Sequence, residues 1–223
     1  MKKFKLPIIP FIVFVVIAQT AASGAVETER LGEIVGACGE CHGDNGISKG
    51  LVIPNLAGQD RTYLENQIEE FRHKPRKELE QFQLKIRDSH TMDNQSTRFD
   101  ADELAAITGY FSDLRCPEED RAPVQTTSIR CGECHGNDGI SRKPGVPNLA
   151  GQKEAYLLAQ LKMFKATILE RNKVRPSPSD SPERSPARRY HRTMGQWAAR
   201  LSEQEMIIAA KYYSSLPGIW VCK

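Results

Sequence analysis

Apolar side chains recur at helical spacing in two stretches of this 223-residue chain, residues 63–72 and residues 156–164. A shorter amphipathic segment at residues 31–37 precedes the first of them. No alternation of apolar and polar residues runs far enough to predict a strand. The pattern therefore predicts an all-α protein.

The last helix of each half carries its own start signal. Asp100 stands in an N-cap position with Glu103 three residues later, and Ser202 and Glu205 repeat this spacing. Each start is followed by an apolar stripe on one helical face: Leu104, Ile107 and Phe111 in the first half, and Met206, Ala209 and Tyr213 in the second.

These elements belong to an internal repeat. Cys-Gly-Glu-Cys-His-Gly occurs at residues 38–43 and 131–136, and the same offset of 93 carries Pro-Asn-Leu-Ala-Gly-Gln at 54–59 onto 147–152. Near the last helix of each half the offset becomes 102. The difference predicts an insertion in the second copy, for which residues 171–189 are the candidate because they are rich in Pro, Ser and Arg.

The N-terminus is typical of a secretory signal. Three lysines, an apolar run and small residues succeed one another over residues 1–25, and the apolar run is too short for a membrane span of about 20 residues. Cleavage is expected after Ala22 or Ala25, with an uncleaved anchor as the alternative. Two domains are then predicted, residues 26–118 and 119–223, joined by an acidic linker that contains Pro117 and Pro123.

Charge divides unevenly between these domains. Residues 26–118 carry 11 basic and 18 acidic side chains, a net charge of −7, whereas residues 119–223 carry 17 and 10, a net charge of +7. Two interpretations remain open: the polarity orients a redox partner, or the two halves dock on each other. Nucleic-acid binding is disfavoured, because the chain is exported and its mature net charge is zero.

The repeated Cys-x-x-Cys-His motif is the attachment signature of a c-type haem. Two thiols add across the haem vinyl groups, and the adjacent histidine provides an axial imidazole ligand to the iron. Zinc binding by the four cysteines and thioredoxin-like dithiol chemistry are the alternatives, but they leave the histidines or the duplication without a role. Two covalent haems are therefore predicted, held by Cys38, Cys41, His42, Cys131, Cys134 and His135.

The second axial ligand decides between electron carrier and catalyst, because a methionine closes the site and raises the potential. Met92 and Met194 are predicted to be these ligands: they lie outside the helical pattern and share the offset of 102. Met163 and Met206 fall within periodic helices and are predicted to be core residues.

Histidine is the rival ligand. His90 and His191 differ by 101 positions and so do not superpose when the methionines do. These two and His73 are predicted to be exposed polar side chains. A haem-ligating histidine usually donates its other N–H to a carbonyl, and Pro54 and Pro147, each 12 residues after its histidine, are candidates for that carbonyl.

On these motifs the chain resembles the class I cytochromes c, specifically the di-haem cytochrome c4 type. The resemblance rests on the two haem motifs, the Pro-Asn-Leu-Ala-Gly-Gln segments, Met92 and Met194, and the aromatic ends of the last helices. It implies two tandem class I cytochrome c domains, each wrapped around one haem, with His42/Met92 and His135/Met194 ligation. It also implies a periplasmic carrier that passes electrons between a quinol-oxidising complex and a terminal oxidase or reductase.

Two other classes remain open: the haem subunit of a larger enzyme such as a flavocytochrome sulfide dehydrogenase, and a di-haem enzyme such as a thiosulfate dehydrogenase or peroxidase. Two departures from the family pattern stand out. The insertion at 171–189 predicts a mobile loop, or else an arginine-rich surface for an acidic partner or for peripheral binding to anionic lipids. Cys116 and Cys222 stand at equivalent ends of the copies, and whether they pair stays open.

Overall fold

The computed structural model describes residues 26–72, 86–87, 89–120, 130–173 and 189–222. The predicted signal segment, most of the linker, His73 and most of the predicted insertion lie outside these residues.

The elements of the first half are α1 (Thr28–His42), α2 (Arg61–Arg72), β1 (Ile86–Arg87), α4 (His90–Ser96), α5 (Ala101–Asp113) and η1 (Glu118–Asp120). Those of the second half are α6 (Gly132–His135), α7 (Glu154–Lys173), β2 (Arg189–Tyr190), α8 (Arg192–Arg200) and α9 (Glu203–Ser215).

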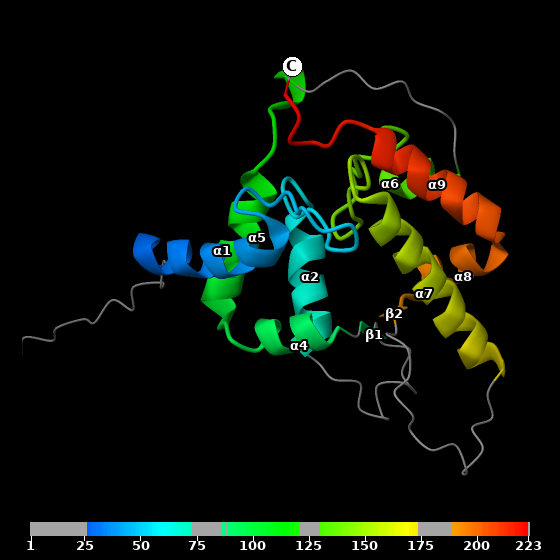
Figure 1. Cartoon of the computed structure of the whole chain (residues 1–223), viewed down its shortest axis with the longest axis horizontal. Helices are drawn as coiled ribbons and strands as arrows, with labels where there is room; N and C mark the ends of the chain where they lie inside the picture. Colours follow the sequence, from blue (N-terminus) through cyan, green and yellow to red (C-terminus); the bar gives the residue numbers. More distant parts are fainter. Residues whose placement is uncertain (1–25, 73–85, 88, 121–129, 174–188, 223) are drawn as a thin grey trace, which may run out of the picture.

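The two halves form two helical units that lie side by side (Figure 1). The predicted all-helical class is confirmed, and both last helices start with the predicted capping boxes at Asp100 and Ser202. The helix at each haem motif ends at its histidine, α1 after 15 residues and α6 after four. Helix α7 extends beyond the predicted segment to 20 residues.

Each unit has its own apolar core. In the first, α1, α2 and α5 pack through Ile34, Leu64, Leu104, Ile107 and Phe111, all buried. In the second, α7 and α9 pack through Leu157, Ala210 and Tyr213, with Ala150 and Leu216 buried beside them. Two separate cores agree with the repeat, since each copy buries its own helical faces.

The units meet through side-chain amides that the repeat places symmetrically. The Asn55 backbone donates to Gln152 Oε1 at 2.9 Å, and Gln152 Nε2 donates to the Asn55 carbonyl at 3.0 Å. The equivalent pair has the same form: the Asn148 backbone N–H donates to Gln59 Oε1 at 2.7 Å, and Gln59 Nε2 donates to the Asn148 carbonyl at 3.0 Å. The Pro-Asn-Leu-Ala-Gly-Gln segment therefore builds the contact between the units.

A two-residue antiparallel ladder also joins the units. Ile86 of β1 pairs with Tyr190 of β2, and Arg87 pairs with Arg189. Paired positions differ by 102 or 104, so the Arg87–Arg189 pair has the offset that relates the methionines. Two residues are too short a run for periodicity to predict a strand.

The end of the chain returns to the first unit. Cys116 and Cys222 form a disulfide across a sequence separation of 106, and the Cys116 backbone N–H donates to the Ile219 carbonyl at 3.0 Å. The pairing that the sequence left open is thus present. Among the described helices, none combines the length and apolar character that a membrane crossing requires.

Candidate functional site

One cavity of about 770 Å³ reaches both haem motifs. Its walls come from both units, and most of the side chains in them are apolar, among them Leu64, Phe71, Leu104, Leu157 and Phe164. Seven of the eight predicted site residues line it: Cys38, Cys41, His42, Met92, Cys131, His135 and Met194. The eighth, Cys134, is exposed, with the Lys143 ammonium 3.8 Å from its sulfur.

A glycine turn after each motif shapes the loop beneath the histidine. Gly46 has φ +72°, and a Cβ there would stand 2.8 Å from the Ala57 nitrogen. Gly139 has φ +73°, with the Ala150 nitrogen 2.9 Å from the same point. Both glycine carbonyls accept from the Leu-Ala pair that follows, at 2.7 and 3.1 Å in each copy. Only glycine fits this left-handed, closely approached position.

Each motif histidine is held by the predicted carbonyl. His42 Nδ1 lies 2.9 Å from the Pro54 oxygen, and His135 Nδ1 lies 2.9 Å from the Pro147 oxygen. A carbonyl only accepts, so Nδ1 carries the proton and Nε2 keeps a lone pair for a metal. Burial lowers the pKa of His135, which keeps that imidazole neutral. The predicted role of the two prolines is confirmed.

Two of the four motif cysteines are partly buried, and the other two are exposed. Burial raises the pKa of Cys38 and of Cys131, so neither thiol is activated as a thiolate. Within the described ranges, no group of three or more His, Cys, Asp or Glu side chains is placed to hold a metal ion. Zinc ligation by the four motif cysteines would require all four in one such group.

Met92 and Met194 both lie in helices, contrary to the prediction that they stand outside helical segments. Each is the third residue of a short helix, α4 or α8, and each backbone N–H is capped from three residues earlier. The cap is Ser89 Oγ at 3.4 Å in the first copy and His191 Nδ1 at 3.3 Å in the second. Periodicity missed these helices because seven and nine residues give too few turns to show it.

The capping geometry explains the misaligned histidines. His191 corresponds to Ser89 and is half-buried as an N-cap, so its prediction as an exposed polar side chain was wrong. His90 is exposed, as predicted. Met206 is a buried core residue, as predicted, whereas Met163 is half-buried and lines the cavity. Met163 is therefore a third methionine beside the candidate site.

These residues fit a c-type haem. The cavity has apolar walls, two imidazoles whose Nδ1 donates to a prolyl carbonyl, motif thiols and two methionines at equivalent positions. Haem would be held by Cys38, Cys41 and His42 in one unit and by Cys131, Cys134 and His135 in the other. The two cysteine pairs imply two covalently attached haems.

A buried arginine also lines this cavity. Arg189 is 6% exposed and donates to Tyr63 Oη at 2.7 Å and to Gln67 Oε1 at 3.0 Å, both on α2 of the other unit. It also donates to Gln160 of α7 and lies over the Phe164 ring, 4.5 Å from its centroid. The sequence predicted that Arg189 belongs to an exposed loop or docking surface. That prediction was wrong, because Arg189 lies in β2 and its side chain is buried against the cavity.

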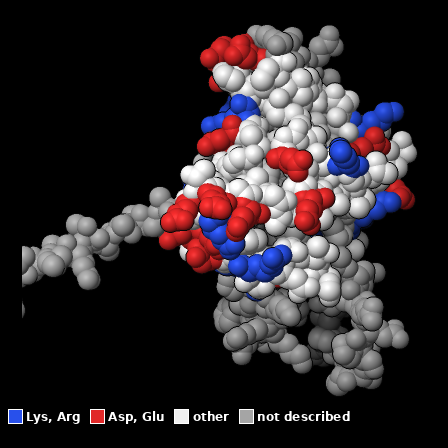
Figure 2. All heavy atoms as spheres, turned by 60° about the vertical axis from the view of Figure 1, so that its left-hand side comes forward, with Lys and Arg blue, Asp and Glu red and all other residues white. Residues whose placement is uncertain are grey.

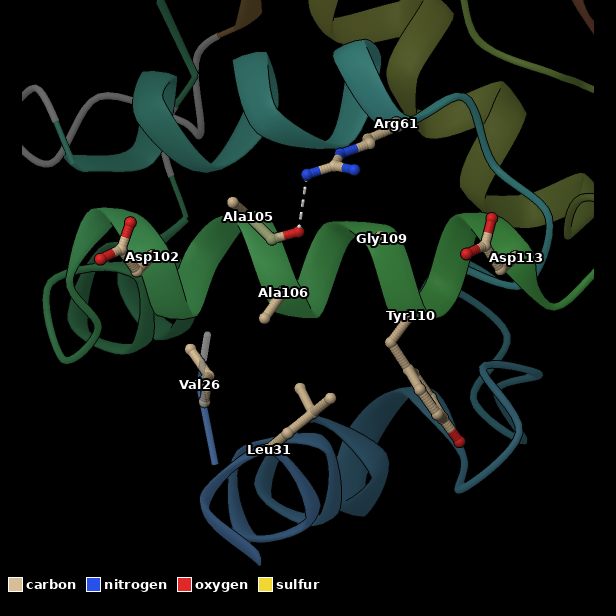
Figure 3. A pocket seen from close by; sticks show the side chains of 9 residues that line it. All are labelled: Val26, Leu31, Arg61, Asp102, Ala105, Ala106, Gly109, Tyr110 and Asp113. Atoms are coloured by element: carbon tan, nitrogen blue, oxygen red, sulfur yellow. Dashed lines mark hydrogen bonds between the residues drawn. The ribbon is translucent and has the colours of Figure 1, made fainter. Parts of the chain in front are cut away.

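A second hollow, of about 490 Å³, lies between α1 and α5 (Figure 3). Leu31, Ala106 and Tyr110 line it, and Arg61 at its edge donates to the Ala105 carbonyl at 3.0 Å. No cysteine, histidine or methionine contributes to its lining. It therefore offers neither an attachment point nor an axial ligand for haem.

Surface charge follows the predicted polarity on the face that carries α1. Acidic side chains gather there, with fewer basic ones among them (Figure 2). The ion pairs between described residues all lie within one half, such as Arg30–Glu103 and Lys162–Glu203. Charged groups do contribute to the contact between the units, since Asp60 accepts from the Gly145 backbone at 2.8 Å and Arg189 donates to Tyr63, so both interpretations of the charge polarity stay predictions.

Comparison with known proteins identifies the class. The family model for cytochrome c matches twice, over residues 33–115 and 125–217. The chain belongs to the cytochrome c family, as two tandem domains.

Within that family it resembles the cytochromes c4. It superposes on the crystal structure of cytochrome c4 from Pseudomonas stutzeri with a TM-score of 0.58 at 23% identity, covering 86% of this chain and 100% of that one. It is 50% identical to cytochrome c4 of Pseudomonas aeruginosa over 54 residues, which is 23% of this chain and 27% of the relative. The predicted fold is confirmed: the chain is a c4-like cytochrome c with two tandem domains.

A relative with a different name matches over a longer span. The thiosulfate dehydrogenase electron acceptor of Stutzerimonas stutzeri is 26% identical over 194 residues, covering 81% of this chain and 79% of the relative. This relative is by name an electron acceptor, and it matches more of this chain than the cytochrome c4 of Pseudomonas aeruginosa does.

Proposed function

We propose that this chain is a periplasmic di-haem electron-transfer protein that carries single electrons between respiratory redox partners. Residues 1–25 would direct its export, and the domains 26–118 and 119–223 would each hold one haem. The observation that carries the proposal is the duplicated imidazole, oriented by a prolyl carbonyl at 2.9 Å and facing a cavity that a methionine also lines. Export accords with the Cys116–Cys222 disulfide, since disulfides persist in oxidising compartments.

The axial pairs would be His42 with Met92 and His135 with Met194. When bound, each haem supplies a one-electron ferrous–ferric couple. The imidazoles fix its position, because Pro54 and Pro147 hold their tautomer and ring orientation. The Met92 and Met194 thioethers would favour the ferrous state, and the apolar side chains of the cavity would exclude water. No substrate bond is broken.

A spectroelectrochemical titration of the mature holoprotein tests the ligand pairs. We expect two low-spin haems of fairly high potential, each with the methionine-to-ferric-iron charge-transfer band. Met92→Ala and Met194→Ala should each remove that band from one haem and lower its potential, whereas Met163→Ala should leave both bands intact. A band lost with Met163 instead of Met194 would reassign the second axial ligand.

The partner belongs to one of two groups. Respiratory complexes, such as a quinol-oxidising complex and a terminal oxidase or reductase, accord with the c4 resemblance. A thiosulfate dehydrogenase as electron donor is the second candidate, favoured by the match to the Stutzerimonas stutzeri electron acceptor over 81% of this chain. Stopped-flow reduction by each donor separates them: the physiological donor reduces both haems at the higher second-order rate.

Charge polarity supports a partner with an acidic docking face for the second domain, whose sequence carries a net charge of +7. The association rate should then fall as salt rises, because the Debye length shortens to about 10 Å at 0.1 M. A rate that does not depend on salt would remove this part of the proposal.

A further inference from the structure

Arg189 is a buried cation whose hydrogen-bond partners are all neutral. Its side chain donates to a phenol and two amides, those of Tyr63, Gln67 and Gln160, and stacks on Phe164. Glu70 is an acidic side chain close enough to act on it electrostatically. Within the described residues, the guanidinium therefore has no hydrogen-bonded counter-ion.

Such an arrangement is costly unless an anion completes it. Removing a charge from water costs several kcal/mol, and buried arginines are normally paired with carboxylates or phosphates. A guanidinium has five N–H donors in a planar fork that suits a carboxylate. Neutral acceptors satisfy part of this fork but supply no negative charge, so Glu70 is the acidic side chain that acts on the guanidinium.

The position of Arg189 shows where such an anion would lie. The residue lines the cavity that both haem motifs share, and it bonds to α2 of one unit and α7 of the other. Its ladder partner in β1 is a second arginine, Arg87. The β1–β2 ladder therefore holds Arg189 where the two units meet.

We propose that the Arg189 guanidinium binds a propionate carboxylate of haem at the boundary between the two domains, and that its charge raises the reduction potential of that haem. The inference rests on the proposed function, because it requires haem in this cavity. Propionates are the only anionic groups on the haem periphery, and Arg189 is the buried cation that lines the cavity wall in the described chain.

The direction of the effect follows from electrostatics. Ferric haem carries one more positive charge than ferrous haem, so a fixed buried cation nearby favours the ferrous form. Removing that cation should lower the potential. Salt screens this effect of the Arg189 charge on the potential only weakly, because the side chain is 6% exposed.

The test compares three substitutions in the full holoprotein. Arg189→Met removes the charge and keeps much of the volume, and we expect at least a tenfold shift of one haem toward the ferric state, which is about 59 mV for one electron. Arg189→Lys keeps the charge but loses the fork geometry, and its potentials should stay nearer to wild type than those of Arg189→Met. Arg200→Met is the matched control, because it removes an exposed, stacked arginine from the same half, and it should leave both potentials almost unchanged.

The readings distinguish a charge effect from loosened packing. A purely structural role predicts that Arg189→Lys and Arg189→Met shift the potentials alike, and that result would overturn the inference. So would unchanged potentials in Arg189→Met with the methionine charge-transfer bands intact.

A crystal structure of the wild-type holoprotein decides the contact directly, even if a variant fails to fold. A haem carboxylate within hydrogen-bond distance of Arg189 supports the inference, whereas a free oxyanion or water in its place overturns it. Two covalent haems without this contact would remove the inference and leave the proposed function standing. A wild-type protein without covalent haem would remove both.

Discussion

The two copies differ at one ring in the middle of their cores. Phe111 is 1% exposed and Tyr213, its counterpart at the offset of 102, is 2% exposed. The Tyr213 hydroxyl finds no hydrogen-bond partner within the described chain, and burial raises the pKa of this phenol well above its ordinary value. An unsatisfied buried hydroxyl costs about 1–3 kcal/mol.

We therefore expect Tyr213→Phe to leave the free energy of unfolding unchanged or to raise it by up to about 1 kcal/mol. The reverse change, Phe111→Tyr, should lower it, because it adds a hydroxyl to a filled core. Denaturant titration of the holoprotein measures both. A loss of more than about 1 kcal/mol in Tyr213→Phe would mean that the hydroxyl gains a partner once haem is bound.

At the scale of single helices, the capping boxes outweigh the neighbouring ion pair. In α5 the Asp100 carboxylate accepts from the Glu103 backbone N–H at 2.8 Å, and the Glu103 carboxylate accepts from the Asp100 backbone N–H at 3.0 Å. Arg30 also contacts Glu103, at 2.7 Å, but its side chain is 48% exposed. Caps contribute about 1 kcal/mol, whereas exposed ion pairs contribute about 0–1 kcal/mol.

Asp100→Ala and Ser202→Ala are thus each expected to lower the free energy of unfolding by about 1 kcal/mol. Arg30→Ala should cost less than either. Thermal or denaturant unfolding checks the order, and a larger loss for Arg30→Ala than for Asp100→Ala would contradict it.

Two equivalent pairs of hydrogen bonds join the units, and we call each pair an amide clasp: Asn55 with Gln152, and Asn148 with Gln59. Gln152→Ala would leave the Asn55 backbone N–H and carbonyl without their partner, and Gln59→Ala would do the same to Asn148. We expect both changes to lower the free energy of unfolding by about 1–3 kcal/mol and to do so nearly equally. Gln196→Ala, at an exposed position on α8, is the control and should stay within about 0.5 kcal/mol of wild type. Very different costs for the two clasps would show that the symmetry is geometric but not energetic.

For the whole molecule, the disulfide restricts the unfolded chain. It closes a loop with a sequence separation of 106 and ties the C-terminal segment to the first unit. Replacing both Cys116 and Cys222 with Ala should lower the free energy of unfolding by about 2–4 kcal/mol. Calorimetry or denaturant titration of this variant measures the loss, and the reduced wild type should match it. Equal stability of the oxidised and reduced proteins would contradict the prediction.

The sequence by itself determined the class, the repeat and most of the candidate site. Covalent haem attachment needs a fixed local motif, and a helix cap needs fixed spacing, so Cys38, His42 and Asp100 could be identified from neighbouring residues alone. The prolyl carbonyls at Pro54 and Pro147 could also be predicted, because the repeat holds them at a constant distance from the histidines.

The tertiary structure alone decided what joins the two halves. The Asn55–Gln152 clasp and the Cys116–Cys222 disulfide span about half the chain, so no local pattern encodes them. Arg189 shows the limit most clearly. In sequence it belongs to a polar, arginine-rich stretch that predicts exposure, but pairing of β2 with β1 carries it into the shared cavity. Burial of a single side chain depends on which distant segments pack around it, and that is a property of the folded chain.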